Sequence, residues 1–165
     1  MTSSAVSIAP SGEHAQPRRD RLADHCDVIQ APRSAHEWIL DSFRDQIRPI
    51  EGARDAALLR DAMARIIRCN EGVALVAVPR GYGEDFVGWL VSLASLPQAA
   101  LYIYVRRRFR LAHLGTLLLR ARALSGTVGL AYSTGDAVAA QTAGMPVEHS
   151  ILAYRALLSF TRRGI

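Results

Sequence analysis

The sequence predicts a single α/β domain, and three observations lead to that prediction. The chain has 165 residues, of which 50% are hydrophobic and 21% charged, a globular composition with enough apolar side chains for one core. Two segments with helical hydrophobic spacing come first, and a β-branched apolar run at 73–78 then changes the period. Strand and helix patterns alternate from there on. The apolar content excludes general disorder, and no apolar run reaches the roughly 18 residues of a membrane span.

Composition indicates where the domain begins. Residues 1–27 mix Ser, Pro, Gly, Arg and Asp and predict a flexible lead-in, so the domain is expected over 28–165. No signal peptide is evident at the N-terminus. Cys26 and Cys69 fit neither a zinc motif nor a disulfide framework, which predicts no metal site and a cytoplasmic location.

The first elements follow from capping and spacing. A short strand is expected at 28–31. Ser34 and Glu37 fit a capping box, so a helix is predicted behind them that stops at Pro49, and a second helix is predicted at 54–69.

The later elements follow from the changes of hydrophobic period. They are strands at 73–78, 86–93 and 99–105, a helix at 114–124, a strand at 128–132, a short helix at 136–143 and a last strand at 147–154. The predicted order is therefore (β)ααβββαβαβ, with a meander of three strands in the middle.

The positive charge is local. The formal net charge is +5, but the segment 101–122 holds six arginines and no acid, so the rest of the chain sums to −1. All 20 basic residues are arginine, which excludes a lysine nucleophile, Schiff base or P-loop lysine. We therefore expect a local anion site rather than a basic surface over the whole molecule.

The same segment joins a strand to a helix. Its strand 102–105 runs into arginines, then a tight turn ending at Gly115, then a Leu-rich helix. Unpaired backbone N–H groups and the dipole at a helix N-terminus favour phosphate, and flanking arginines add charge-assisted contacts. The sequence predicts a phosphate or pyrophosphate site here.

At this point the chain resembles the GNAT superfamily of N-acyltransferases. Residues 110–115 fit the first and last positions of the family pattern Arg/Gln-x-x-Gly-x-Gly/Ala, with His113 where the first Gly is usual. The order of elements matches from about 28 to 154. The resemblance implies a mixed, mostly antiparallel central sheet flanked by helices.

The resemblance also implies a cofactor, acetyl-CoA or another acyl-CoA. In the family the loop N–H groups hold the pyrophosphate, and the strand before the loop pairs with the pantetheine arm and splays from the next strand. Carried onto this chain, the candidate cofactor-binding residues are Tyr104, Val105, Arg110, Leu111, Ala112, His113, Leu114, Gly115 and Thr116.

Candidate catalytic residues are less specific. Many family members place a proton-donating Tyr in the helix that corresponds to 136–143, which here has none. Direct transfer to an amine needs a base that deprotonates the acceptor, and Glu84 is the candidate base. The other candidates for that base are Asp85, His113, Glu148 and His149. Three tyrosines either line the site or belong to the core, and of these Tyr132 is the candidate catalytic residue.

Two functions from different classes follow. The first is a CoA-dependent N-acyltransferase that transfers an acetyl group to an amine of an unknown acceptor. The alternative is a catalytically silent GNAT-like module that contacts nucleic acid or a protein partner through its arginines. No membrane partner is expected, and no pattern indicates an oligomeric state.

Overall fold

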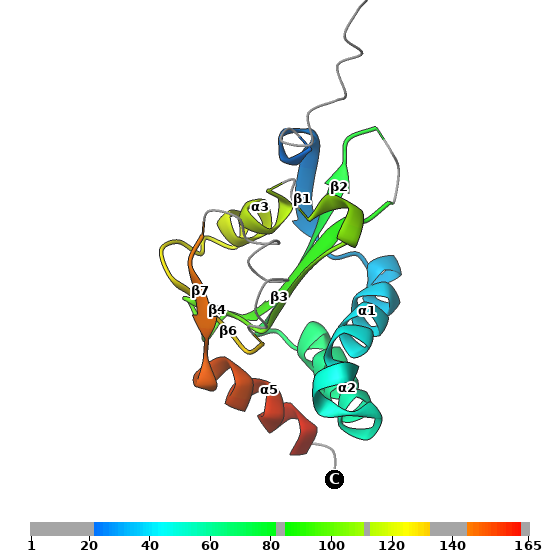
Figure 1. Ribbon diagram of the computed structural model, residues 1–165, viewed down its shortest axis with the longest axis vertical. Helices are drawn as coiled ribbons and strands as arrows, with labels where there is room; N and C mark the ends of the chain where they lie inside the picture. The colour runs from blue at the N-terminus through cyan, green and yellow to red at the C-terminus, as the bar shows by residue number, and fades with distance from the viewer. Residues whose placement is uncertain (1–21, 82–84, 111–112, 133–144, 163–165) are drawn as a thin grey trace, which may run out of the picture.

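The computed structural model describes residues 22–81, 85–110, 113–132 and 145–162. Figure 1 shows strands flanked by helices on both sides. The elements are the strands β1 (Cys26–Gln30), β2 (Gly72–Pro79), β3 (Gly88–Leu93), β4 (Ala99–Ala100), β5 (Tyr102–Val105), β6 (Val128–Leu130) and β7 (Val147–His149), the helices α1 (Arg33–Glu51), α2 (Ala53–Arg68), α3 (Leu114–Ala121) and α5 (Ile151–Arg162), and the 3-10 turns η2 (Ala23–His25) and η3 (Arg107–Phe109). The predicted mixed α/β fold, with its mostly antiparallel sheet flanked by helices, is confirmed.

The strands form two sheets that meet at one residue. β1, β2, β3 and β5 form a four-stranded antiparallel sheet in that order, and β4, β6 and β7 form a parallel sheet of three. Only Leu101 separates β4 from β5 in the chain. The predicted strand 99–105 is therefore divided, its first part pairing with β6 and its second part with β3.

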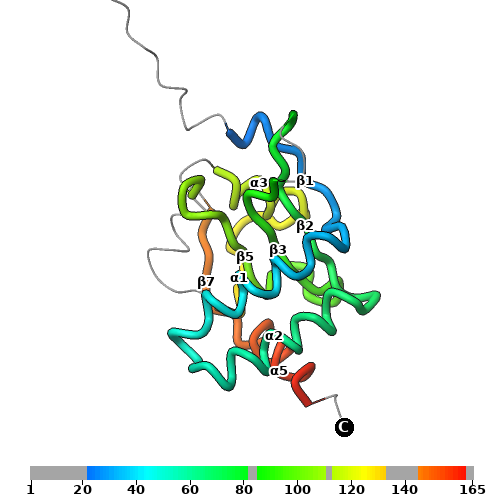
Figure 2. Tube along the Cα trace, turned by 90° about the vertical axis from the view of Figure 1, so that its right-hand side faces the viewer, coloured from blue at the N-terminus to red at the C-terminus, as the bar shows by residue number. Residues whose placement is uncertain are grey.

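Helices cover both faces of the four-stranded sheet. Because side chains alternate along a strand, Val76, Trp89 and Val91 face one side, where they pack with buried residues of α1, α2 and α5. Ala77 and Leu90 face the other side, where they pack with α3. Figure 2 is seen from the α1 side, with the strands behind that helix. In Figure 1 and Figure 2 alike, α5 lies beside α2.

Two boundaries near the N-terminus differ from the predictions. β1 begins at Cys26 and so includes the last two residues assigned to the lead-in. α1 begins at Arg33 with Pro32 as its N-cap, so Ser34 lies inside the helix and makes no capping bond. The helix also runs past Pro49 and ends where Gly52 adopts a φ of 82°, a left-handed conformation that glycine favours.

The predicted last strand is wrong over most of its length. Only 147–149 are extended, as β7, and α5 begins at Ile151. The Ser150 hydroxyl accepts a hydrogen bond from the backbone N–H of Ala153 at 3.2 Å, so it caps the helix. Ala153 and Leu157 are buried at helical i, i+4 spacing. The predicted helix 136–143 lies outside the described residues. Among the described helices, none is long and apolar enough to cross a membrane.

Candidate functional site

The site is built around the edge of β5. β4 and β6 pair through Ala99–Gly129 and Ala100–Leu130, and this pairing stops there. From Tyr102 onward, β5 pairs with β3 alone among the described strands. The backbone groups that β5 turns away from β3 therefore face no described strand, and a strand edge of this kind can pair with an extended ligand. This is the separation of strands 102–105 and 128–132 that the resemblance implied.

The turn after β5 leads to the N-terminus of α3. Residues 107–109 form the 3-10 turn η3, and His113 precedes the first helical residue. His113 has φ 58° and ψ 15°, in the left-handed region that glycine adopts most readily. The backbone here thus has the conformation suited to the glycine that the family pattern usually places at this position. Leu114, Gly115 and Thr116 form the first turn of α3 and are buried.

Arg110 connects this turn back to the strand. Its Nε donates a hydrogen bond to the carbonyl oxygen of Val105 at 3.3 Å, and its side chain is half-buried. The guanidinium group therefore stays close to the end of β5, and no described group accepts from its two NH₂ groups, which can donate to an anion. Val105 itself is fully buried against the α3 side of the sheet.

The six arginines of 101–122 do not form the single anion site expected from the sequence. Arg106 follows the alternation of β5 to the α1 side, where its guanidinium lies over the Trp38 ring at 5.0 Å. Arg122 donates to the Ser92 hydroxyl at 2.7 Å and so links α3 to β3. Arg120 is exposed in the last turn of α3, at the helix end opposite His113. The loop therefore keeps three of the six arginines, which are Arg107, Arg108 and Arg110.

The α1 side of β5 is aromatic. Tyr104 is half-buried, stacks on Trp89 with ring centroids 5.9 Å apart, and meets Trp38 edge-on at 6.0 Å. Tyr102 is buried against Phe43 at 5.3 Å. Burial raises the pKa of Tyr102 to about 12, so its hydroxyl is protonated at neutral pH.

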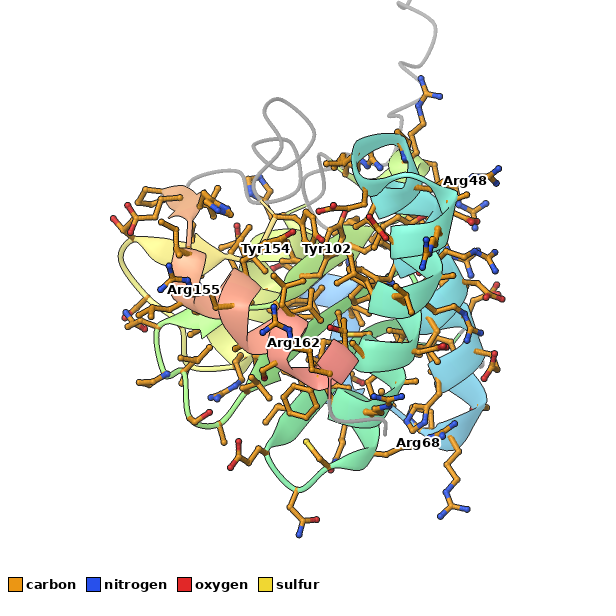
Figure 3. All side chains as sticks on the ribbon, turned by 90° about the horizontal axis from the view of Figure 1, so that it is seen from below. Arg48, Arg68, Tyr102, Tyr154, Arg155 and Arg162 are labelled. Carbon is orange, nitrogen blue, oxygen red and sulfur yellow. The ribbon has the colours of Figure 1, made fainter. Side chains whose placement is uncertain are left out.

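Tyr132, which follows β6, contacts a carboxylate. Its hydroxyl donates to Glu51 Oε1 at 2.9 Å, and Tyr154 of α5 reaches the same oxygen at 3.3 Å. Burial, together with the hydrogen bond to Glu51 and its charge, raises the pKa of Tyr132 well above the ordinary value. Figure 3 shows Tyr102 and Tyr154 in the region between α5 and the helices α1 and α2.

The predicted residues are thus partly assembled. Tyr104, Val105, Arg110, His113 and the first turn of α3 surround the junction of β5 and α3. Glu84, Leu111 and Ala112 lie outside the described residues.

The prediction missed Glu51 and Tyr154. Each lies in a helical segment with no local motif, and only the packing of α1 and α5 around residue 132 brings them together.

Comparisons with known proteins add one structural likeness. No protein-family model matches the sequence, and no curated protein matches it. Among solved structures, the chain is similar to AAC(6′)-Iy in complex with the bisubstrate analog CoA-S-monomethyl-acetylneamine. The two chains are 14% identical with a TM-score of 0.45, and the match covers 86% of this chain and 95% of the other. Chains this distantly alike need not share a ligand or a reaction.

Proposed function

We propose that the chain is a CoA-dependent N-acyltransferase of the GNAT type. The observation that carries the proposal is the junction of β5 and α3. After Ala100 the strand has no second partner strand among the described residues, and it leads within a few residues to arginines and a helix N-terminus. An acyl-CoA is both an extended amide chain, which pairs with a strand edge, and a pyrophosphate, which binds at a helix N-terminus.

The residues present suit each part of that molecule. No described group accepts from the two NH₂ groups of Arg110, which can donate to phosphate oxygens, and the N-terminus of α3 supplies the positive end of a helix dipole. The edge of β5 at Ile103 supplies backbone groups for the pantetheine amides. Acetyl-CoA is the proposed acyl donor, and the acceptor is an amine.

The proposed reaction forms one bond and breaks another. The neutral amine attacks the thioester carbonyl carbon, the new C–N bond forms, and the C–S bond breaks. The proton lost by the nitrogen ends on the CoA sulfur, so the products are an N-acyl amine and CoA. Glu84 is the proposed base, as the sequence suggested.

Tyr132 is the proposed hydroxyl group near the leaving sulfur. Its raised pKa makes it a poor net proton donor to a thiolate, whose conjugate acid has a pKa of about 8.5. The hydroxyl has a single proton, which it donates to Glu51 Oε1, so it can bond the leaving sulfur only after turning away from that carboxylate. In that orientation we assign Tyr132 a hydrogen bond to the sulfur rather than a full proton transfer.

The test is acetyl-CoA binding by isothermal titration calorimetry. We expect the wild type to bind with micromolar affinity and Arg110→Ala to bind at least about tenfold more weakly, because a charge-assisted contact to phosphate is lost. Arg120→Ala is the matched control, since it removes the same charge at the far end of α3. Failure of the wild type to bind better than millimolar would rule out the acyltransferase. Equal binding by Arg110→Ala would rule out this placement of the pyrophosphate.

The nucleic-acid alternative has less support. Arg106 and Arg122 contact groups within the fold, so the arginines do not form one continuous basic surface. A module that holds nucleic acid through phosphates would instead bind a DNA or RNA oligonucleotide with steeply salt-dependent affinity. The same calorimetry with an oligonucleotide in place of acetyl-CoA separates the two functions.

The proposed cytoplasmic location rests on cysteine usage. Cys26 and Cys69 are both free. Free thiols are usual in a reducing compartment. Location by cell fractionation tests this part of the proposal.

A further inference from the structure

One carboxylate is held by side chains from three separate elements. Glu51 is the last residue of α1 and is half-buried. Its Oε1 accepts hydrogen bonds from the hydroxyl of Tyr132, which follows β6, and from that of Tyr154 on α5. The two tyrosine rings meet edge-on, 82° apart, with centroids separated by 5.6 Å. The carboxylate position is therefore fixed by packing as well as by hydrogen bonds.

The charge of Glu51 has no partner among the described residues. The ion pairs in that part of the chain involve other carboxylates, and no described group donates to Glu51 Oε2. Arg48 precedes Glu51 by one helical turn, but Figure 3 shows it well away from Tyr154. Asp55 adds negative charge nearby, since it raises the pKa of Tyr154 after the larger effects of burial and Glu51. Hydroxyl donors carry no charge, so they leave the negative charge of Glu51 without an ion pair among the described residues.

The carboxylate lies next to the point where β5 and β6 separate. The Tyr132 ring is 6.1 Å from the ring of Tyr102, the first residue of β5. Tyr102 faces α1, whereas the side chain of Val105 faces α3. The carboxylate and the N-terminus of α3 are thus on opposite sides of the sheet, with β5 between them.

We infer that Glu51, Tyr132 and Tyr154 bind a cationic amine group of the acceptor substrate. This inference deepens the proposed acyltransferase function and rests on it. A primary ammonium group has three donors, and the free carboxylate oxygen with the two phenol oxygens supplies acceptors for them. Calcium takes six to eight oxygen ligands, and magnesium requires a near-ideal octahedron, so two carboxylate oxygens and two phenols suit an ammonium better than either metal ion.

The test uses 1,4-diaminobutane as the probe, with butane-1,4-diol as its uncharged counterpart. We expect calorimetry to show that the intact wild-type chain binds the diamine and not the diol. E51Q should weaken diamine binding at least about tenfold, because the amide oxygen can still accept from the two tyrosines while the negative charge and the second acceptor oxygen are lost. D45N removes a charge from the same helix at an exposed position and should change the affinity less than about twofold.

A second variant distinguishes a loss of the binding site from a folding defect. Y154F removes one hydroxyl oxygen and leaves the stronger 2.9 Å bond from Tyr132 to Glu51 in place. It should weaken diamine binding while acetyl-CoA binding stays at the wild-type level. Circular dichroism shows whether each variant is folded.

The outcomes separate the two proposals. Equal diamine affinity in wild type and E51Q, or no diamine binding by the wild type, overturns the cation site even when acetyl-CoA binds. Diamine binding that depends on Glu51 in a chain that does not bind acetyl-CoA supports the cation site and rejects the acyltransferase.

Discussion

At the level of single residues, the backbone of His113 and the buried Nε of Arg106 each cost free energy in the folded state. His113 adopts the left-handed region, which costs an L-residue roughly 1–2 kcal/mol. The Nε atom of Arg106 is buried and has no hydrogen-bond partner in the part of the chain that the structure describes. Such costs persist where the surrounding structure compensates them, and they concentrate at functional sites. Both residues lie in the segment that connects β5 to α3, which agrees with a role for this segment in ligand binding.

Ser42 links α1 to the buried indole of Trp89. The Ser42 hydroxyl accepts from Trp89 Nε1 at 2.8 Å and donates to the carbonyl of Trp38 at 2.7 Å. Trp89 is fully buried, so Ser42→Ala leaves its N–H without a partner or water. We expect Ser42→Ala to lower the free energy of unfolding by about 1–3 kcal/mol, as measured by urea denaturation.

A second serine supplies the comparison. Ser159 donates to the carbonyl of Ala156 on α5, and its removal leaves no buried donor unpaired. Ser159→Ala should therefore change stability by less than about 0.5 kcal/mol. Similar losses in the two variants would mean that the indole hydrogen bond contributes little.

At the scale of elements, the close approach of β3, β5 and α3 positions the loop. Gly88 lies where the three meet. A Cβ added there would lie 2.9 Å from the carbonyl oxygen of Tyr104 and 3.3 Å from Leu118 Cδ1. One of these neighbours is backbone, so the strands must move apart to admit a methyl group. The absence of a side chain on Gly88 therefore allows β5 and α3 to reach their observed positions.

Gly88→Ala should accordingly destabilise the fold. We expect a loss of roughly 1–3 kcal/mol, the usual cost of overpacking, in a thermal or urea unfolding experiment. Gly126→Asn is the control, because its added Cβ meets nothing within 4 Å and Asn tolerates the positive φ of 69°. A loss at Gly126 as large as that at Gly88 would contradict the steric explanation.

At the scale of the whole molecule, buried titratable groups lie in the core on both faces of the sheet. Burial raises the pKa of Tyr102 to about 12 and that of the Cys26 thiol to about 11. The pKa of Tyr132 is raised further, by burial and by Glu51. In the unfolded chain these groups lose their protons near pH 8.5 for Cys and pH 10 for Tyr. The folded state therefore binds more protons than the unfolded state in the alkaline range.

This difference predicts alkaline unfolding. The stabilisation is complete below the unfolded pKa values and is lost as the pH rises toward about 12, because the unfolded state deprotonates first. Urea denaturation between about pH 8 and pH 11 should show the free energy of unfolding falling with pH. Tyr102→Phe should flatten the part of the decline above about pH 10. Stability that does not change across this range would contradict the assigned burial of these groups.

Local patterns predicted the elements whose periods are clear. The helix at 54–69 and the strand at 73–78 are α2 and β2 to within one residue at either end. The last strand failed because an apolar run does not by itself separate strand from helix. The cap at Ser150 and the i, i+4 spacing of Ala153 and Leu157 were the available signals for α5.

The candidate site divides in the same way. The residues from Tyr104 to Thr116 are consecutive in the chain, so their residue types and spacing could indicate an anion site. The side of the sheet on which each arginine side chain lies could not be predicted. It depends on neighbouring elements, as the contact of Arg106 with Trp38 and the bond of Arg122 to Ser92 show. The charge that seemed to form one patch is therefore distributed over two sides of the sheet.

Local patterns in the sequence were enough to predict the order of the elements from β1 to β6, the six-arginine segment and the turn before α3, because hydrophobic period, charge and turn chemistry act over a few residues. The packing of distant elements determines where the pairing with β6 ends, which arginines lie at the loop, and that Glu51 contacts Tyr132 and Tyr154. Each of these depends on contacts between residues far apart in the chain, 81 positions for Glu51 and Tyr132. Such contacts exist only after the hydrophobic faces of several elements have packed together.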